Sequence, residues 1–335
     1  MQRISIALTN ACNLKCKYCF AQNITKENHL FLKPDEYKTL LDFVLTATKD
    51  IGIAGGEPTI NPWFREIIEL TLNDSRVNSV TFFSNGINAE KYIDLFLHEK
   101  SHVLLNVNSD EDIGSENFKK IDSFLENIYP NLPKEKIADK VVLGLNLYDN
   151  DLDYSFIFPL LKKYSMRNLR VSITTKIDAP ELEILDYFKE RKDYLFRFLQ
   201  DCVKNGIYPH PDCNIMPICL WTKDEIDYLH RHGLHPFVAN SICSTPVITL
   251  LPDKTAVNCF ALDSISKVPL YKFKDAYELI NYYNIHINSY IFSSYTNEKC
   301  KKCRDRINGL CSMGCPSMRL KSIKQFMDLE NNLKL

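Results

Sequence analysis

Short β-branched runs alternate with amphipathic segments along the first two-thirds of the chain. The runs predict strands at 4–8, 50–54, 77–83, 103–107, 141–147 and 169–174. Between the strands, apolar residues recur at helical spacing. Pro34 stands where a helix begins, and Asn61–Pro62 is a plausible N-cap and N1 pair for the next helix. Further helices are predicted through Tyr92 to Phe96 and over about 116–128, 154–164 and 180–204.

This alternation predicts an α/β fold. Repeated βα units place their strands side by side in a parallel sheet, and six of them imply a partial, TIM-like (β/α)6 barrel. In such barrels the loops after the strand carboxyl ends carry function. We therefore look for chemistry after each predicted strand.

The pattern changes after residue 205. Between 206 and 240 the chain carries four prolines with little periodicity, which predicts a linker or wrapping segment. Residues 249–260 predict a hairpin that turns at Pro252–Lys254, although glycine would be the stronger turn signal. We therefore divide the chain into a barrel at 1–205, a linker at 206–240 and a smaller cysteine-rich domain at 241–335.

Composition and charge are those of an ordinary globular protein. The 335 residues are 45% hydrophobic and 25% charged, with a formal net charge of −1. This balance gives no basic surface for nucleic acid or an anionic membrane. The N-terminus has too short an apolar stretch for a signal peptide, and no segment is apolar enough to span a membrane. We expect a cytoplasmic protein.

Twelve cysteines then become informative. A reducing compartment disfavours structural disulfides, so closely spaced thiols are better explained as metal ligands. Three lie between 12 and 19, none between 20 and 201, and nine between 202 and 315. The sequence therefore has two separate candidate metal regions.

The first region is Cys12-x3-Cys16-x2-Cys19, directly after the first predicted strand. Three thiolates can hold one face of a cubane iron–sulfur cluster and leave its fourth iron open. An open iron is needed if the cluster is to bind a substrate. A zinc site is the alternative, but zinc usually takes four nearby ligands, and the next candidate, His29, is ten residues further on.

Two motifs together resemble the radical S-adenosylmethionine (radical SAM) superfamily: Cys-Asn-Leu-Lys-Cys-Lys-Tyr-Cys after the first strand and Gly55-Gly56-Glu57-Pro58 after the second. The resemblance implies a [4Fe–4S] cluster whose open iron binds S-adenosylmethionine. One-electron reduction then breaks the sulfonium bond to C5′, and the 5′-deoxyadenosyl radical abstracts hydrogen from a substrate. A reductant such as flavodoxin or ferredoxin would supply the electron.

The resemblance also suggests which residues contact S-adenosylmethionine. Tyr18 matches an aromatic position near the adenine, and the two glycines allow close approach of the backbone. Glu57 can accept a hydrogen bond from the ligand's ammonium group. The remaining candidates follow the third and fourth strands, where polar turn residues on a barrel rim are the alternative: Ser84, Asn85, Asn106 and Asn108. Relatives carry Ser-x-Asp-Gly after the fourth strand, and this chain departs from that pattern.

The second region has the spacing Cys300-x2-Cys303-x7-Cys311-x3-Cys315, with Cys243 and Cys259 upstream. It resembles the SPASM-type extension, which houses auxiliary iron–sulfur clusters in radical enzymes that modify peptides and proteins. Three features depart from that family. Lys254 replaces a glycine, the gap before Cys311 is seven instead of five, and no cysteine follows Cys315.

The resemblance implies two ligand sets, each one ligand short. One contains Cys243, Cys259 and Cys315, and the other contains Cys300, Cys303 and Cys311. Cys213 or Cys219 is the preferred candidate to fill the vacancies, with Cys202 as a third, and any of these three can instead be a buried core cysteine. A zinc site formed by the last four cysteines remains open.

Function follows from analogy with the SPASM-like extension. We expect a radical enzyme that modifies a side chain of a ribosomally made peptide or protein, and one or two auxiliary clusters. Since the first strand begins near the N-terminus, a separate leader-binding protein would be needed, or direct binding at the barrel mouth. The alternatives are a dehydrogenase of a small molecule or of a sulfatase-type Cys/Ser, and a non-catalytic scaffold. No catalytic base is singled out, because Asp110, Glu111 and Asp178 suit solvated loop positions equally well.

Overall fold

The computed structural model describes residues 4–25, 29–131, 140–174, 184–238, 247–294, 298–311, 313–320, 323–324 and 327. Within these ranges the strands form a single sheet. Its members are β1 (Ile4–Ala7), β2 (Asp50–Ala54), β3 (Ser79–Ser84), β4 (Ser101–Asn106), β5 (Val141–Leu147), β6 (Asn168–Ile173), β7 (Tyr208–Pro211), β8 (Ile248–Leu250), β9 (Thr255–Asn258) and β10 (Val268–Pro269).

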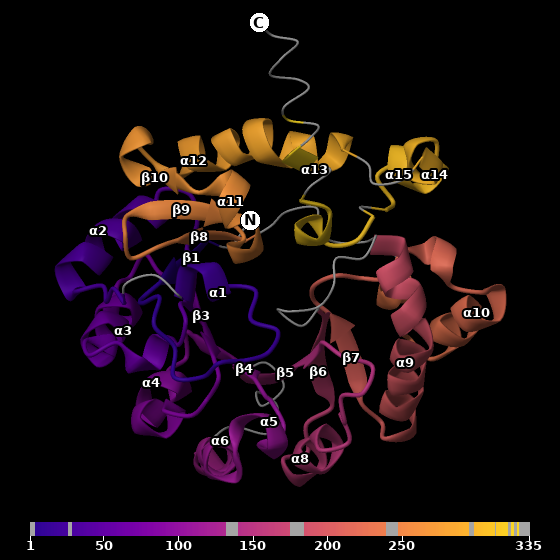
Figure 1. Ribbon diagram of the computed structural model, residues 1–335. Coiled ribbons are helices and arrows are strands. Elements are labelled where there is room, and N and C mark those ends of the chain that lie inside the picture. The colour runs from indigo at the N-terminus through magenta and orange to yellow at the C-terminus, as the bar shows by residue number, and fades with distance from the viewer. Residues whose placement is uncertain are drawn as a thin grey trace, which may run out of the picture.

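The strand order is β10-β9-β8-β1-β2-β3-β4-β5-β6-β7. Strands β1 to β7 are parallel to their neighbours, so their carboxyl ends meet at one edge. They form an open arc with helices around its outside (Figure 1). The predicted α/β partial barrel is therefore confirmed, with a seventh parallel strand added.

Helices fill the connections between strands. Their bounds are α1 (Gln22–Thr25), α2 (Pro34–Val44), α3 (Phe64–Asn73), α4 (Ile93–Leu97), α5 (Asp110–Ile113), α6 (Ser115–Ile128), α8 (Ile157–Lys163), α9 (Ile184–Lys204), α10 (Lys223–Arg231), α11 (Asp263–Ser266), α12 (Ala276–Tyr283), α13 (Ser289–Ser293), α14 (Glu298–Lys301) and α15 (Arg304–Ile307). None of the described helices is long and apolar enough to cross a membrane.

The helix predicted from Asn61 begins later than expected. Pro58–Ile60 forms a 3-10 turn, and α3 begins at Phe64. The Asn61 side chain is buried, donates to the carbonyl oxygens of Leu8 and Leu32, and accepts from the Trp63 amide. Asn61 therefore ties the ends of neighbouring segments together before the helix starts.

The stretch 206–240, which we expected to be a linker, contains β7 and α10. Tyr208–Pro211 pairs in parallel with Asn168–Val171. Proline cannot donate to a ladder and is tolerated at a sheet edge, and β7 is the last strand of the sheet. Two of the four prolines that suggested a linker, Pro209 and Pro211, therefore belong to an edge strand.

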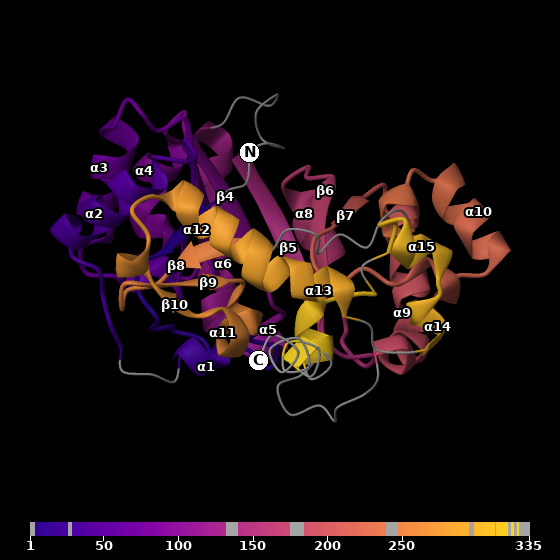
Figure 2. The same ribbon diagram turned by 90° about the horizontal axis from the view of Figure 1, so that it is seen from above.

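The predicted hairpin forms as β8 and β9, which pair antiparallel. β8 also pairs in parallel with β1, so this hairpin extends the barrel sheet at its first strand. Lys254, in the turn, adopts φ +60°, where glycine is favoured. Above the hairpin, α12 and α13 run across the open side of the arc and are joined by a π-helical turn at Asn284–Asn288 (Figure 2).

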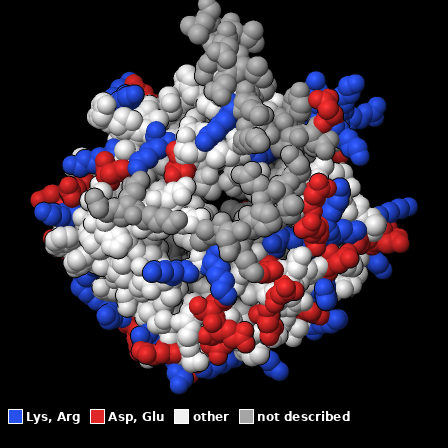
Figure 3. Space-filling view, in the orientation of Figure 1, with Lys and Arg blue, Asp and Glu red and all other residues white. Residues whose placement is uncertain are grey.

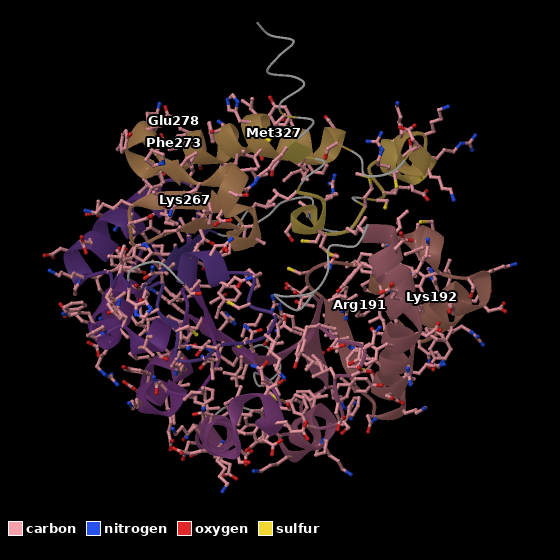
Figure 4. The ribbon with its side chains drawn as sticks, in the orientation of Figure 1. Arg191, Lys192, Lys267, Phe273, Glu278 and Met327 are labelled. Atoms are coloured by element: carbon pink, nitrogen blue, oxygen red, sulfur yellow. The ribbon has the colours of Figure 1, made fainter. Side chains whose placement is uncertain are left out.

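One apolar core joins both halves of the chain. It includes Ile4 and Ile6 of β1, Phe198 of α9, and Leu279 and Ile291 of the C-terminal helices. Figure 4 shows Lys267, Phe273 and Glu278 in the C-terminal layer on one side, and Arg191 and Lys192 on α9 on the other. The C-terminal layer therefore spans from the β1 side of the barrel towards α9.

Candidate active site and cysteine groups

The cysteine triplet lies in the loop that leaves the carboxyl end of β1. The start of this loop is fixed by Thr9, whose hydroxyl donates to the Leu30 carbonyl oxygen at 2.7 Å and accepts from the Ala11 amide at 3.0 Å. Asn10 accepts from the Leu30 amide at 2.7 Å. All three thiols remain partly accessible. The loop therefore holds Cys12 at a fixed position and presents its thiols to the barrel end.

The Gly55–Pro58 segment follows β2 and packs against the start of that loop. The Gly56 amide donates to the Thr9 carbonyl oxygen at 2.9 Å, and the Glu57 amide donates to that of Ala11 at 2.8 Å. A Cβ atom on Gly56 would overlap the Ala11 carbonyl and lie 3.0 Å from the Cys12 Cβ. Glycine is therefore required there for the two strand ends to meet.

Glu57 lies at the centre of a buried hydrogen-bond network, with 1% of its surface exposed. Its Oε1 accepts from the Thr59 amide, the Thr59 hydroxyl and the Ser84 hydroxyl, and its Oε2 accepts from the Asn85 amide at 2.8 Å. Burial raises the pKa of Glu57 above its ordinary value. The carboxylate thus connects the ends of β2 and β3, and Asn85 in turn donates to Asn13 in the cysteine loop.

Tyr18, in the cysteine loop, contacts residues that follow β4 and β5. Its hydroxyl donates to Asn108 Oδ1 at 2.7 Å, and its ring stacks on Tyr148 with centroids 5.1 Å apart. The Asn108 amide nitrogen lies 3.9 Å from the Cys16 sulfur. These contacts bring the predicted residues Tyr18 and Asn108 together beside Cys16.

Sequence reasoning missed Asp112, which anchors the same loop. Its Oδ1 pairs with Lys17 Nζ at 2.8 Å, and its Oδ2 accepts from the Tyr148 hydroxyl at 2.6 Å. Lys17, Tyr18, Asn108 and Asp112 line a hollow of about 50 Å³ next to Cys16. The sequence signal for Asp112 was its position soon after the predicted strand at 103–107.

A second cluster of polar side chains lies on strands β4 and β6 and directly after β7. Arg170 donates to Asn106 at 3.3 Å and forms an ion pair with Asp212, which also accepts from the Ser172 hydroxyl at 3.1 Å. Asn106 was predicted, whereas Arg170 and Asp212 were missed. Polar residues at 168, 170 and 172 alternate along β6, and this period-2 pattern was a signal for a polar face.

The pKa values of the three thiols of the triplet depend on burial and on neighbouring groups. Burial, followed by neighbouring charges that include Glu57 and Cys19, raises the pKa of Cys12 to about 11. Burial and the other two thiols raise the pKa of Cys16 to about 12, and burial raises that of Cys19. Burial is the largest cause in each case, because a thiolate is poorly solvated in this loop. The irons of a bound cluster would stabilise the thiolates and offset that cost.

The donor set suits a cluster. A structural zinc ion usually takes four protein ligands, whereas this loop supplies three thiols. Three thiolates can hold three irons of a cubane and leave its fourth iron without a protein ligand. The triplet therefore fits a cubane.

The C-terminal cysteines fall into two groups with different surroundings. Cys315 and Cys259 both contribute to raising the pKa of Cys213, and Cys315 contributes to raising that of Cys259. The Cys315 amide donates to Asn214 at 2.9 Å. Cys219 lies near the second group, whose other members are Cys300, Cys303 and Cys311. Cys243 and Asp178 lie outside the described residues.

Cys202 differs from these cysteines because it is a core residue. It lies on α9 with no exposed surface and belongs to the main apolar core. Cys213 has accessible surface, yet burial is the main cause that raises its pKa. Figure 3 shows basic and acidic side chains both spread around the rim of this face.

An α/β partial barrel with an open three-thiol site at its first strand end defines a class of iron–sulfur enzyme. Residues 6–153 match the model of the radical SAM superfamily, so this part of the chain forms a radical SAM domain. The superfamily uses a [4Fe–4S] cluster and S-adenosylmethionine.

Curated relatives match only part of the chain. A probable GTP 3′,8-cyclase of Methanocaldococcus jannaschii is 33% identical over 132 residues, covering 37% of this chain and 41% of that protein. A GTP 3′,8-cyclase of Mannheimia succiniciproducens is 28% identical over 189 residues, covering 52% and 55%. The chain spans about half the length of these relatives or less, so their name does not define its substrate.

Solved structures match nearly the whole chain. Streptococcus suis SuiB bound to S-adenosylmethionine aligns with a TM-score of 0.63 at 13% identity, covering 96% of this chain and 74% of that one. SuiB bound to the precursor peptide SuiA aligns with a TM-score of 0.64 at 14% identity, covering 96% and 73%. This likeness establishes the fold shared by the barrel and the C-terminal region.

Proposed function

We propose that Cys12, Cys16 and Cys19 hold a [4Fe–4S] cluster at which S-adenosylmethionine is cleaved reductively. The observation that carries this proposal is the contact between the Gly55–Glu57 backbone and the start of the cysteine loop. It joins the two motifs at adjacent strand ends, although they are separated by more than thirty residues of sequence. When bound, the cluster supplies one electron to the sulfonium, and the C5′–S bond breaks to give methionine and a 5′-deoxyadenosyl radical.

The surrounding residues have distinct parts in this proposal. Gly55, Gly56 and Pro58 shape the strand end so that backbone groups can approach the ligand. Glu57 holds Ser84 and Asn85 in place through its carboxylate, and these two residues would border the ribose. Tyr18 and Asn108 border the adenine side, while Asn106 lies further along the barrel with Arg170.

For the substrate we propose a side chain of a ribosomally made peptide or protein. SuiB, which resembles this chain over both the barrel and the C-terminal region, is described as binding a precursor peptide. A flavodoxin or ferredoxin would deliver the electron, and a separate protein could bring the peptide's leader. The C-terminal cysteines would hold auxiliary clusters close to the substrate.

The similarity to GTP 3′,8-cyclases favours a second candidate, a radical reaction on a small molecule. Those matches cover 37% and 52% of the chain, whereas the SuiB likeness covers 96% and so includes the C-terminal layer. We therefore place the peptide first and use GTP as the competing substrate in the test.

The cleavage step is tested with anaerobically reconstituted protein, S-adenosylmethionine and dithionite. We expect 5′-deoxyadenosine from the wild type and from Cys202→Ala, and at least a hundredfold less from Cys16→Ala. Equal formation by Cys16→Ala would refute the barrel site. Candidate peptides encoded beside the gene and GTP are then supplied separately, and mass spectrometry follows the product. A modified nucleotide with unchanged peptides would overturn the peptide assignment.

A further inference from the structure

The strongest unassigned feature is the group of four thiols around the 300–311 segment. Cys300, Cys303 and Cys311 supply three thiols to this group, and a cubane with a protein ligand on every iron needs a fourth. Cys219, far upstream between β7 and α10, is the described cysteine that lies beside that site.

Residues 300–311 fold into a compact unit. The Cys303 amide donates to the Cys300 carbonyl oxygen at 3.2 Å, and the Cys311 amide donates to that of Asp305 at 3.1 Å. Arg306 Nε donates to the Cys300 carbonyl oxygen at 2.8 Å. These bonds return the chain at Cys311 to the turn that carries the first two thiols. The Met313 amide then donates to the Cys311 sulfur at 3.3 Å, a contact that also suits a cluster ligand.

Cys219 reaches this unit from the barrel. It lies in the 3-10 turn Ile218–Leu220, which packs against α9, and the next residue, Trp221, contacts Phe196 of that helix. Figures 1 and 2 both place α14 and α15 over the α9 and α10 side of the barrel. The Cys219 thiol is exposed, so it does not serve as a core residue.

Charge around the group suits an anionic cluster. Between residues 298 and 311 the chain carries five basic and two acidic side chains. A cubane with four thiolates has a net negative charge, which nearby lysines and arginines stabilise. The basic residues that surround these cysteines therefore have a local electrostatic reason to be there.

We propose that Cys219 is the fourth ligand of a [4Fe–4S] cluster held with Cys300, Cys303 and Cys311. This assignment rests on the proposed function only for the kind of cluster. It closes the site with protein ligands, so this cluster would transfer electrons without binding substrate at an iron. Cys202 has no part in it.

The test starts from a Cys12/Cys16/Cys19→Ala background, which removes the barrel cluster. Adding Cys219→Ala is expected to remove about four further irons per chain, or to leave a three-iron cluster with its own electron paramagnetic resonance signal. Adding Cys202→Ala instead should change neither the iron content nor the spectrum. Unchanged iron and spectra in the Cys219→Ala protein would overturn the assignment. If the triple variant holds as much iron as the wild type, the barrel site fails, independently of Cys219.

A second measurement avoids substitutions in the cluster site. The loaded wild-type protein is treated with iodoacetamide before and after iron is removed by a chelator, and labelled peptides are identified by mass spectrometry. We expect Cys219 to be protected with iron and at least tenfold more labelled without it. Cys202 should stay unlabelled in both folded samples. Equal labelling of Cys219 in the two samples would refute its role as a ligand.

Discussion

Glu57 shows at the level of one residue how the carboxyl ends of β2 and β3 are joined. The backbone amides of Thr59 and Asn85 donate to different oxygens of its carboxylate. A glutamine has only one oxygen, so whichever way its amide is turned, one buried N–H loses its acceptor. An unpaired buried donor costs about 1–3 kcal/mol.

We therefore predict that Glu57→Gln lowers the free energy of unfolding of the apo protein by about 1–3 kcal/mol in chemical denaturation. Glu66→Gln, on the exposed side of α3, is the matched control and should change it by less than about 0.5 kcal/mol. Equal effects of the two substitutions would show that Glu57 does not tie these strand ends.

Lys254 carries a backbone cost that glycine would not. Its φ of +60° lies in the left-handed region, which costs a residue with a Cβ about 1–2 kcal/mol. Lys254→Gly should stabilise the protein by about 0.5–1 kcal/mol, because the greater freedom of glycine in the unfolded chain offsets part of the gain. Lys254→Ala keeps the Cβ and should bring no such gain. Thermal unfolding of both variants decides the matter, and a gain with alanine would contradict the strain argument.

The triplet thiols make the apo protein sensitive to alkaline pH. The folded-state pKa values of Cys12 and Cys16, about 11 and about 12, lie above their ordinary value. Their contribution to stability is therefore full below the ordinary cysteine pKa and is lost as pH rises through 11 and 12. Relative to the Cys12/Cys16→Ala variant, wild-type apo protein should lose stability from pH 8 to 11 under reducing conditions. Parallel curves for the two proteins would contradict this.

At the level of elements, the carboxyl ends of β1 and β2 approach each other through Gly56. An added Cβ would overlap the Ala11 carbonyl, which is backbone and cannot rotate away. Gly314 is similar, because a Cβ there would press on Ile184 and Phe188 of α9. Each glycine permits a cysteine-bearing loop to lie against a neighbouring element.

Gly56→Ala is therefore expected to displace the Cys12 loop and to lower iron by about four per chain, with at least a tenfold loss of 5′-deoxyadenosine formation. Gly233→Ala is the control, because no atom lies within 4 Å of the Gly233 Cβ position, although its φ of 72° strains an alanine there. It should cost some stability and leave the iron content unchanged. Full iron in Gly56→Ala protein would show that the close approach is not required.

At the level of the whole molecule, β1 lies between β2 and β8, so the C-terminal region completes the sheet that the N-terminus begins. The same apolar core contains Ile4 of β1 and Ile248 of β8. Our division into a barrel at 1–205 and a domain at 241–335 remains a prediction, and this shared sheet argues that the two fold together.

Native-state hydrogen exchange provides the test. The amides of β8 should open with the same free energy as those of β1, because one cooperative unit holds both strands. The amides of helix α10 serve as the internal reference and should exchange faster than those of β1 and β8. Much faster exchange in β8 than in β1 would mean that the C-terminal region opens separately from the barrel.

Local patterns in the sequence were sufficient for much of this structure. Six predicted strands match β1 to β6 within a few residues, and 141–147 matches β5 at both ends. Strand and helix periodicities are set by neighbouring residues, so they can be read without knowing the fold. The cysteine triplet and Gly55–Pro58 were identified in the same way, because each motif is contiguous.

Long-range pairing could not be read from such patterns. The prolines of Tyr208–Pro211 suggested a linker, and only the position of β7 at the sheet edge makes them acceptable in a strand. Likewise, nothing local says that β8 pairs with β1, or that Cys202 lies in the core while Cys219 lies beside Cys300. Those arrangements depend on contacts between residues distant in sequence, where burial and backbone hydrogen bonding across the whole chain select one partner among several.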